Sequence, residues 1–355
     1  MRIGIPREVK VLEGRVGLIP AAAAELVRHG HEVFIEQGAG GASGYPDADY
    51  AARGIQVVAD AKTLYAGAEL IVKVKEPQLQ ELELLRSDHL LFCYLHLAAE
   101  VELLAALKEI GLTAVGFETV ELADGSLPLL APMSDIAGRI AAQIGATLLH
   151  RPQGGRGLLL GGLPGVERGR VVVLGAGTVG SNATRMAAAM GAEVSVFDRN
   201  RDKLAAMRAL GPNVTGLHAY ADAIDEAVKD ADLLIGAVLV TGARAPHLVS
   251  AEQVRQMKPG SVIIDVSVDQ GGCIETTRPT TYAEPTYLWE GVVHFGVTNM
   301  PGAVPRSASQ ALSAAITPYA LKLTQPGWDA DPALALGINT RAGKAVHPAL
   351  REKAT

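Results

Sequence analysis

The sequence has little cysteine, no excess of basic residues and no long apolar run, and each of these absences excludes a class of protein. Cys93 and Cys273 are too few to build a disulfide framework and suit a reducing compartment, so we expect a cytoplasmic protein. The formal net charge of −6 argues against nucleic-acid binding, which normally needs a basic surface. No apolar run approaches the roughly 20 residues of a membrane-spanning helix. The N-terminal residues Met1–Glu8 lack the apolar core of a secretion signal and resemble a first strand.

Composition and length predict a folded protein with two domains. Hydrophobic residues make up 48% of the 355 residues and charged residues 20%, a balance typical of globular rather than disordered chains. Domains commonly hold about 100–200 residues, so the length accommodates two. Strand-like and helix-like segments alternate, which predicts parallel sheets with crossover helices. The expected strands are Arg2–Ile5, Glu32–Glu36, Leu70–Lys75, His89–Tyr94, Thr113–Phe117, Val171–Leu174, Glu193–Asp198, Leu233–Gly236 and Ser261–Val266, and the helices include Pro20–His29 and Ala99–Ile110.

Two long helices are expected to connect the domains. One spans Ser134–His150 and opens on a serine, a good N-cap residue; the other extends from about Ser307 to Thr324. The glycine-rich stretch Gln153–Gly162 is expected to be a loop against the second domain, with disorder as the alternative.

These segments predict an α/β fold of two Rossmann-like, doubly wound parallel sheets joined by the long helices. Residues 1–128 would form the first segment of a substrate domain, residues 129–305 a nucleotide-binding domain, and residues 306–355 a return helix and tail that complete the substrate domain. Open α/β sheets bind ligands beyond the carboxyl ends of their strands, so the active site is expected in the cleft between the domains.

A glycine-rich turn after the strand at residues 171–174 is the strongest functional signal. Gly175, Gly177 and Gly180 have the GxGxxG spacing: the first allows a tight turn, the second lets the backbone approach a pyrophosphate, and the third lets the helix pack on the strand. A helix follows, and then a second strand that ends at Asp198, where an acid can bind a ribose 2′-hydroxyl and repel a 2′-phosphate. The pattern predicts an NAD site.

Three basic residues lie at the ends of strand-like segments of the first domain or after them. Arg15 precedes a helix and could hold a small carboxylate through its guanidinium, although a solvated surface arginine is the alternative. Lys75 comes at the end of an apolar segment and could point into the cleft, with a structural role equally open. Lys73 is expected to reach solvent from the face of the sheet.

Further polar residues follow other strands. His96 could act as a general acid–base, or be a hydrogen-bonded core histidine. Asp269 could hold a ligand hydroxyl or a water or take part in proton transfer, or merely cap a turn, whereas Asp265 is expected to be structural. The amide of Asn299 could bind nicotinamide ribose or substrate. No cluster has metal-ligand spacing and no hydrolase or phosphate-loop motif is present, so hydride transfer fits better than hydrolysis, and no metal is expected.

Nearly the whole chain resembles the bacterial L-alanine dehydrogenases. The segments that carry the resemblance are Gly4–Glu8, Arg15–Gly17, Val72–Pro77, Leu95–Ala98, Leu129–Ser134, Gly175–Gly180, Ile235–Leu239, Asp265–Cys273, Arg278–Thr281 and Thr298–Gly302.

The resemblance implies an NAD-dependent enzyme that interconverts L-alanine with pyruvate and ammonium. By this resemblance Arg15 and Lys75 hold the substrate carboxylate, His96 is the acid–base, and Asp269 assists the proton and water steps. It also implies a homohexamer.

The resemblance further implies the residues that line the cofactor. At Ala219 and Tyr220 the chain lacks the serine that such relatives carry beside the adenosine. The implied positions are Ser134, Gly175, Gly177, Thr178, Val179, Gly180, Asp198, Lys203, Val238, Leu239, Val266, Ser267, Val268, Asp269, Arg278, Val297, Thr298, Asn299 and Met300.

Three other functions remain open at this stage. One is a related amino-acid dehydrogenase that takes glycine or a larger substrate. Another is the soluble NAD-binding subunit of a transhydrogenase, which would exchange hydride with a second nucleotide. The third is a non-catalytic NAD-binding regulator.

Overall fold

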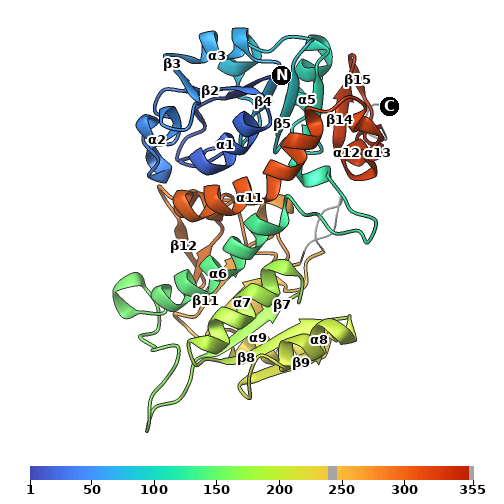
Figure 1. The fold of residues 1–355 in the computed structure, drawn as a ribbon. Coiled ribbons are helices and arrows are strands. Elements are labelled where there is room, and N and C mark those ends of the chain that lie inside the picture. Colours follow the sequence, from blue (N-terminus) through green and yellow to red (C-terminus); the bar gives the residue numbers. More distant parts are fainter. Residues whose placement is uncertain (239–245, 352–355) are drawn as a thin grey trace. The chain divides into compact units, whose positions relative to one another are not determined.

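The computed structural model describes residues 1–238 and 246–351. The chain divides into two compact units, Met1–Met133 with Val304–Thr355 and Ser134–Ala303, and each is built on one mixed, mostly parallel sheet (Figure 1).

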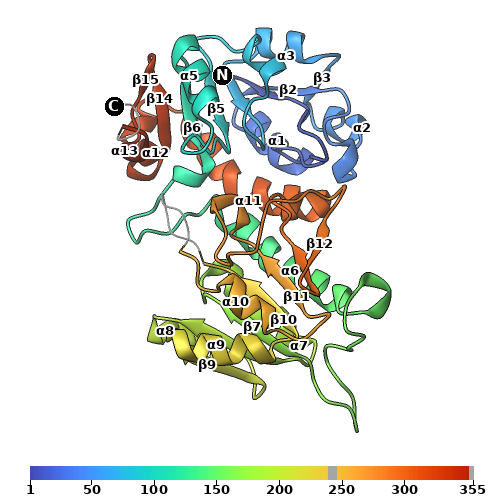
Figure 2. The ribbon, with the colours of Figure 1, turned by 180° about the vertical axis from the view of Figure 1, so that it is seen from behind.

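The sheet of the first unit has eight strands in the order β15-β14-β6-β5-β4-β1-β2-β3. Strands β1 to β6 pair in parallel, and β14 and β15 form an antiparallel edge beyond β6 (Figure 2). Central strands such as Leu70–Val72 and Leu90–Cys93 are short apolar runs with every residue buried, as expected where both faces of a parallel sheet are covered. The strands are β1 (Arg2–Ile5), β2 (Glu32–Glu36), β3 (Gln56–Val58), β4 (Leu70–Val72), β5 (Leu90–Cys93), β6 (Thr113–Gly116), β14 (Ile338–Arg341) and β15 (Lys344–Ala345).

A helix from the C-terminal segment holds the loop that follows β1. The Ser309 hydroxyl of α11 accepts a hydrogen bond from the N–H of Val16 at 3.0 Å, and Ser313 accepts one from Ile19 at 2.9 Å. Both α11 and α1 begin with proline, whose fixed φ suits the first helical position. The helices of this unit are α1 (Pro20–Arg28), α2 (Asp47–Ala51), α3 (Ala61–Gly67), α4 (Leu79–Leu82), α5 (Val101–Ile110), α11 (Pro305–Leu323), α12 (Pro332–Gly337) and α13 (Pro348–Arg351).

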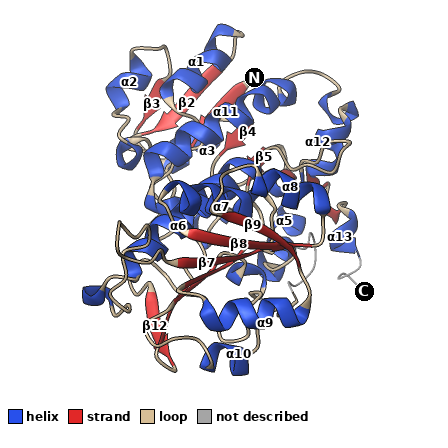
Figure 3. Ribbon diagram, turned by 90° about the horizontal axis from the view of Figure 1, so that it is seen from below, coloured by secondary structure: helices blue, strands red, loops and turns tan. Residues whose placement is uncertain are grey.

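The second unit has a seven-stranded sheet in the order β12-β13-β11-β10-β7-β8-β9. All neighbours pair in parallel except the edge strand β12, and Figure 3 shows β7, β8 and β9 side by side. The strands are β7 (Arg170–Leu174), β8 (Glu193–Asp198), β9 (Val214–His218), β10 (Leu233–Gly236), β11 (Val262–Asp265), β12 (Thr286–Trp289) and β13 (Val292–Phe295), and the helices are α6 (Ala131–Leu148), α7 (Thr178–Ala189), α8 (Arg201–Arg208), α9 (Ala221–Asp230) and α10 (Ala251–Arg255).

Every strand predicted from the sequence is present, and the α/β fold with two mostly parallel sheets is confirmed. Antiparallel strands lie at the edges of the sheets, β12 in one and β14 and β15 in the other. Two details of the prediction are wrong. The strand from Leu70 ends at Val72 rather than at Lys75. Ser134 is not an N-cap, since α6 already begins at Ala131 and Ser134 lies within its first turn.

The glycine-rich loop at residues 153–162 is ordered against the second unit, as predicted. The backbone N–H of Arg156 donates to Gly260 at 3.0 Å and its guanidinium to Asp232 at 2.6 Å. Among the helices of the described residues, none has the length and apolar character needed to cross a membrane.

Candidate active site

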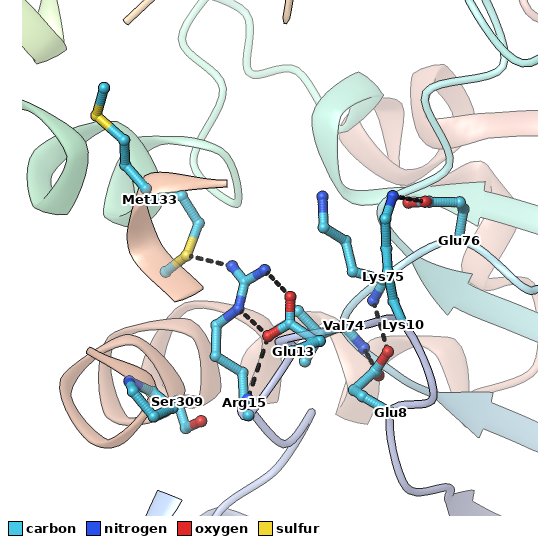
Figure 4. A network of polar contacts seen from close by, with 12 residues as sticks. Glu8, Lys10, Glu13, Arg15, Val74, Lys75, Glu76, Met133 and Ser309 are labelled. Atoms are coloured by element: carbon cyan, nitrogen blue, oxygen red, sulfur yellow. Dashed lines mark hydrogen bonds and ion pairs between the residues drawn. The ribbon is translucent and has the colours of Figure 1, made fainter. Parts of the chain in front are cut away.

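Arg15 lies in a buried loop after β1 and is paired with Glu13. Only 2% of Arg15 is exposed, so the interpretation as a solvated surface arginine is wrong. Its Nε donates to Oε1 of Glu13 at 2.6 Å and its Nη2 to Oε2 at 2.5 Å, while Nη1 lies 3.2 Å from Sδ of Met133 (Figure 4). Burial alone would lower the pKa of Arg15, but the hydrogen bond and charge of Glu13 raise it above its usual value. The guanidinium is therefore permanently charged.

The pair with Glu13 uses one edge of the Arg15 guanidinium. The Nε–Nη2 edge faces the carboxylate, whereas Nη1 faces a thioether sulfur, which is a weak acceptor. A ligand carboxylate at Nη1 would replace that weak acceptor with a charge-assisted one. Arg15 can thus bind a small anion while Glu13 keeps its orientation fixed.

Lys73 is fully buried between two carboxylates. Its ammonium donates to Glu81 at 3.0 Å, to Glu8 at 3.3 Å and to the carbonyl of Lys75 at 3.0 Å. The expectation that Lys73 reaches solvent is wrong, because these partners compensate its burial. Glu8 also accepts hydrogen bonds from the N–H groups of Val74 at 2.6 Å and Lys75 at 3.2 Å. This network fixes the backbone that carries Lys75.

The side chain of Lys75 is half-buried and lies among other charges. Burial lowers its pKa below the usual value; Glu76 opposes this effect, whereas Arg15 and Lys10 reinforce it. In the view of Figure 4 the Lys75 ammonium lies between Arg15 and the Lys10–Glu76 ion pair. Lys75 is therefore a cation that gives up its proton more readily than an ordinary lysine.

His96 follows β5 in an uncommon backbone conformation. Its φ is 51°, in the left-handed region, and its half-buried ring stacks on Tyr94 with centroids 5.9 Å apart and an interplanar angle of 10°. The description of a core histidine fits His89 instead, which is 1% exposed and whose Nε2 lies 3.0 Å from the carbonyl of Tyr65. His96 is a partly exposed residue at the end of a strand.

The first unit brings Arg15, Lys75 and His96 to one edge of its sheet. They follow β1, β4 and β5, which are neighbours, and the strand order reverses between β1 and β4. In open α/β sheets such a reversal forms a crevice at the carboxyl ends of the strands. Within this group Tyr94 stacks against His96, and the charge of Arg15 contributes to the lowered pKa of Lys75.

The glycine turn of the second unit has the geometry that its spacing predicts. Gly175 has a φ of 98°, which L side chains rarely adopt. A Cβ at Gly180 would lie 1.8 Å from the carbonyl oxygen of Gly175, so α7 packs this closely only with glycine there. At Gly177, by contrast, no heavy atom of the described residues lies within 4 Å of a Cβ position. The turn thus combines a tight fold with an accessible backbone at the start of α7.

Asp198 lies against this turn at the end of β8. Its carboxylate accepts hydrogen bonds from the N–H of Ala176 at 2.7 Å and from Asn200 at 2.8 Å. Asn200 in turn caps α8 by accepting from the N–H of Lys203 at 3.1 Å, which places Lys203 in the first turn of that helix. The acid expected from the sequence therefore stands beside the glycine turn.

The other residues singled out as cofactor contacts mostly follow the carboxyl ends of adjacent strands. Val238 comes after β10 with its Cγ2 3.4 Å from a Cβ position at Gly175, and Ser134 lies one helical turn before Gly138, where α6 packs against Val179. Arg278 is exposed with its guanidinium 4.3 Å from the ring centre of Tyr287. Leu239 lies outside the described residues. The segments Val266–Asp269 and Val297–Met300 follow β11 and β13, and Thr178 and Val179 begin α7.

Asp265 closes the loop that carries Asp269, in agreement with the structural role expected for it. Its buried carboxylate accepts hydrogen bonds from Ser267 N–H at 3.0 Å, Cys273 N–H at 2.9 Å, Ile274 N–H at 3.2 Å and the Thr277 hydroxyl at 2.8 Å. Burial raises the pKa of Asp265, although these hydrogen bonds oppose it. Asp269 itself is exposed, within a short 3-10 helix.

Sequence reasoning missed the acids that hold these loops, notably Glu8, Glu13 and Glu118. The partners of Glu8 and Glu118 lie as far as 67 and 22 residues away along the chain, so no local pattern identifies these two acids. Glu13 is only two residues from Arg15, and that short spacing is the local signal that could have found it. In the described part of the chain, no three His, Cys, Asp or Glu side chains form a group that could hold a metal ion.

These features define a two-unit α/β protein with a dinucleotide-type glycine turn in one unit and two cations and a histidine at the strand ends of the other. The chain belongs to the alanine dehydrogenase/PNT family: the N-terminal domain of that family matches residues 4–137 and its C-terminal domain residues 141–348.

Relatives match over almost the full length. The chain is 49% identical to an alanine dehydrogenase of Halomonas elongata, covering 99% of this chain and 96% of the relative, and 52% identical to one of Mycobacterium tuberculosis, covering 97% and 94%. A solved L-alanine dehydrogenase has a TM-score of 0.96 at 53% identity, covering 99% of this chain and 98% of that one. A transhydrogenase from Sinorhizobium meliloti has a TM-score of 0.85 at 27% identity, covering 98% and 100%.

Alanine substitutions at two glycines of the turn should separate ligand binding from folding. Gly180→Ala should destabilise the protein by about 1–3 kcal/mol, as overpacking commonly does. Gly177→Ala should leave the melting temperature unchanged but weaken dinucleotide binding roughly tenfold or more, about 1.4 kcal/mol, because a methyl group would enter the space that a pyrophosphate needs. Thermal melts and NADH titration measure the two effects. Equal NADH affinity in Gly177→Ala and the unmodified protein would contradict the pyrophosphate contact.

Proposed function

We propose that this protein catalyses the NAD-dependent oxidative deamination of L-alanine to pyruvate and ammonium, and the reverse reductive amination. The observation that carries the proposal is the identity of 49–53% to alanine dehydrogenases over 97–99% of the chain. Hydride exchange of the transhydrogenase type is the second candidate, supported by the lower identity of 27%. We further propose a cytoplasmic homohexamer on the strength of the family resemblance.

The residues of the glycine turn fit NAD. Gly177 leaves its backbone accessible, α7 presents its N-terminus, and Asp198 stands where a ribose 2′-hydroxyl would bind. When bound, NAD supplies the acceptor for a hydride from the substrate carbon. The strand-end segments Val266–Asp269 and Val297–Met300 would hold the nicotinamide side of the cofactor, with Asn299 also available to the substrate.

Arg15 and Lys75 would bind the substrate carboxylate and orient Cα. Nη1 of Arg15 donates to the thioether of Met133, a weak acceptor, and a substrate carboxylate would be a stronger, charge-assisted acceptor for the guanidinium. Lys75 would contact the same group and polarise the carbonyl oxygen of pyruvate in the reverse direction. Such anchoring removes much of the entropic barrier to reaction.

His96, assisted by Asp269, would carry out the proton transfers of the reaction. The amine of alanine must be neutral before the hydride can leave Cα, so a base first takes a proton from the ammonium group. After that proton has passed to solvent, the same base takes a proton from the water that adds to the iminium carbon and returns it to the nitrogen. The C–N bond then breaks as the new hydroxyl loses its proton to form the carbonyl of pyruvate, and ammonia leaves to become ammonium.

The unmodified protein should form NADH from L-alanine faster than from glycine or larger L-amino acids, most readily at alkaline pH, where the amine is neutral.

The protein should prefer NAD to NADP, because the Asp198 carboxylate repels a 2′-phosphate. Asp198→Ala should relax this preference, whereas Glu193→Ala, at the exposed opposite end of β8, should not. Steady-state kinetics with both cofactors measure the effect. Equal kcat/KM for NAD and NADP in the unmodified protein would overturn the role of Asp198.

Lys75→Ala should raise the KM for pyruvate tenfold or more, because a charge-assisted hydrogen bond of about 1.5–3 kcal/mol is lost. Since burial lowers the pKa of Lys75, its ammonium deprotonates at a lower pH than the ammonium of a free lysine. The KM for pyruvate should therefore rise with pH as Lys75 loses its proton, and this rise should be absent in Lys75→Ala. Kinetics across the alkaline range provide the test.

Arg15→Lys should raise the same KM, since lysine lacks the planar fork that pairs with Glu13 and a ligand together. Arg7→Ala, at an exposed arginine after the same strand, is the matched control and should leave KM unchanged. An unaltered pyruvate KM in both Lys75→Ala and Arg15→Lys would move the substrate site elsewhere.

His96→Ala should lower kcat by roughly 10²–10⁴, the usual range for loss of general acid–base catalysis. The affinity for NADH should stay the same, because His96 belongs to the other unit from the glycine turn. His29→Ala is the control, since His29 is an exposed histidine of the same unit. Turnover numbers and NADH titrations compare the three proteins, and full turnover of His96→Ala would exclude its catalytic role.

A further inference from the structure

The backbone of His96 has a left-handed conformation, with a φ of 51°, that residues with a side chain adopt infrequently. Among the described residues, the non-glycine positions with positive φ are Leu12, His96, Glu290 and Ala342. A left-handed conformation costs a residue with a side chain roughly 1–2 kcal/mol. Such strained residues persist where the surroundings fix them, often at functional sites. The contacts around His96 therefore identify what fixes it.

The carboxylate of Glu118 binds the backbone at His96. Its Oε1 accepts hydrogen bonds from the N–H of His96 at 2.6 Å and of Leu95 at 3.1 Å, and its Oε2 lies 3.2 Å from the same Leu95 nitrogen. Glu118 belongs to the short helix Phe117–Thr119 that directly follows β6, the parallel neighbour of β5. Hydrogen bonds to an ionised carboxylate are roughly twice as strong as neutral ones. One acid thus ties the ends of two adjacent strands together at the histidine.

Other contacts complete the turn and orient the ring. The His96 carbonyl accepts hydrogen bonds from the N–H of Ala99 at 2.9 Å and of Glu100 at 3.2 Å, which leads the chain into α5. The ring lies nearly parallel to Tyr94, whose hydroxyl donates to the Leu129 carbonyl at 2.7 Å. Glu118 thus binds the backbone at His96, and the imidazole ring lies nearly parallel to the ring of Tyr94.

We propose that Glu118 is a positioning residue of the reaction, which binds the N–H groups of Leu95 and His96 and thereby holds the imidazole in place for proton transfer. The inference rests on the proposed function, in which His96 is the acid–base. Removal of the carboxylate lets His96 relax toward an ordinary backbone conformation, and a displacement of about 1 Å can cost on the order of 10²-fold in rate. The substitution of Glu118 should therefore lower kcat only by displacing His96.

A double-mutant cycle tests whether Glu118 acts on kcat through His96. Glu118→Ala should lower kcat by roughly 10–100-fold, with little change in the KM for pyruvate or in NADH affinity. In the His96→Ala background the same substitution should have no further effect on kcat, because the group that it positions is already absent. Glu118→Gln keeps one acceptor oxygen and should retain more of the activity than Glu118→Ala. Glu121→Ala removes an acid of the same segment, only three residues away, and should leave kcat unchanged.

Each outcome decides between the alternatives. A purely structural role would lower the melting temperature and reduce kcat by the same factor in both backgrounds, which would overturn the proposal, as would full kcat in Glu118→Ala. If Glu118→Ala does not fold, the cycle is run with Glu118→Gln, whose loss of kcat must likewise disappear in the His96→Ala background. Full turnover in His96→Ala alone would instead overturn the catalytic assignment of His96, a failure of the proposed function that is distinct from the outcomes above.

Discussion

The first unit depends on the pairing of one buried cation, Lys73, with two buried carboxylates. The ammonium is fully enclosed and binds Glu8, from the loop after β1, and Glu81, in α4. Because removing one partner of such a network leaves an uncompensated buried charge, at a cost of about 3–5 kcal/mol, β1 and β4 cannot separate at their carboxyl ends without breaking it. The backbone N–H of Lys75 donates a hydrogen bond to Glu8, a member of this network. The backbone that carries the Lys75 side chain is thus held by a buried ion-pair network.

Carboxylates also bind backbone N–H groups at the other strand ends. Glu8, Glu13, Glu118, Asp198 and Asp265 each accept at least one backbone N–H hydrogen bond from a loop that follows a strand. Loops beyond a sheet have N–H groups without ladder partners, and a buried donor must be satisfied. A carboxylate supplies two acceptor atoms and can satisfy several donors together, as Asp265 does. Loops held in this way keep their ligand-facing residues in place without regular secondary structure.

The sequence predicts the strands, the glycine turn and the candidate site residues after strand ends, but not the acids whose hydrogen bonds support these loops. Apolar runs such as Leu233–Gly236 and the glycine spacing identify strands and a nucleotide turn because their signals are local. Arg15 and His96 could be selected because a cation or an imidazole after a strand is conspicuous. The burial of Lys73 was predicted wrongly, since its partner Glu8 is 65 residues away in the sequence and nothing local reveals the pair. Edge strands were missed for a similar reason, because half-exposed segments such as Thr286–Trp289 lack a continuous apolar pattern.

The pKa values of the two cations of the candidate site are shifted in opposite directions. Glu13 raises the pKa of Arg15 despite its burial, so Arg15 is a permanent anchor for an anion. Lys75 has no such bidentate partner in the hydrogen bonds described above, and burial together with repulsion from Arg15 lowers its pKa. A bound carboxylate would offset that repulsion and favour the protonated lysine. Anion binding and proton uptake at Lys75 are then linked, so that the lysine is most firmly protonated when its substrate is present and a polarised carbonyl oxygen needs a hydrogen-bond donor.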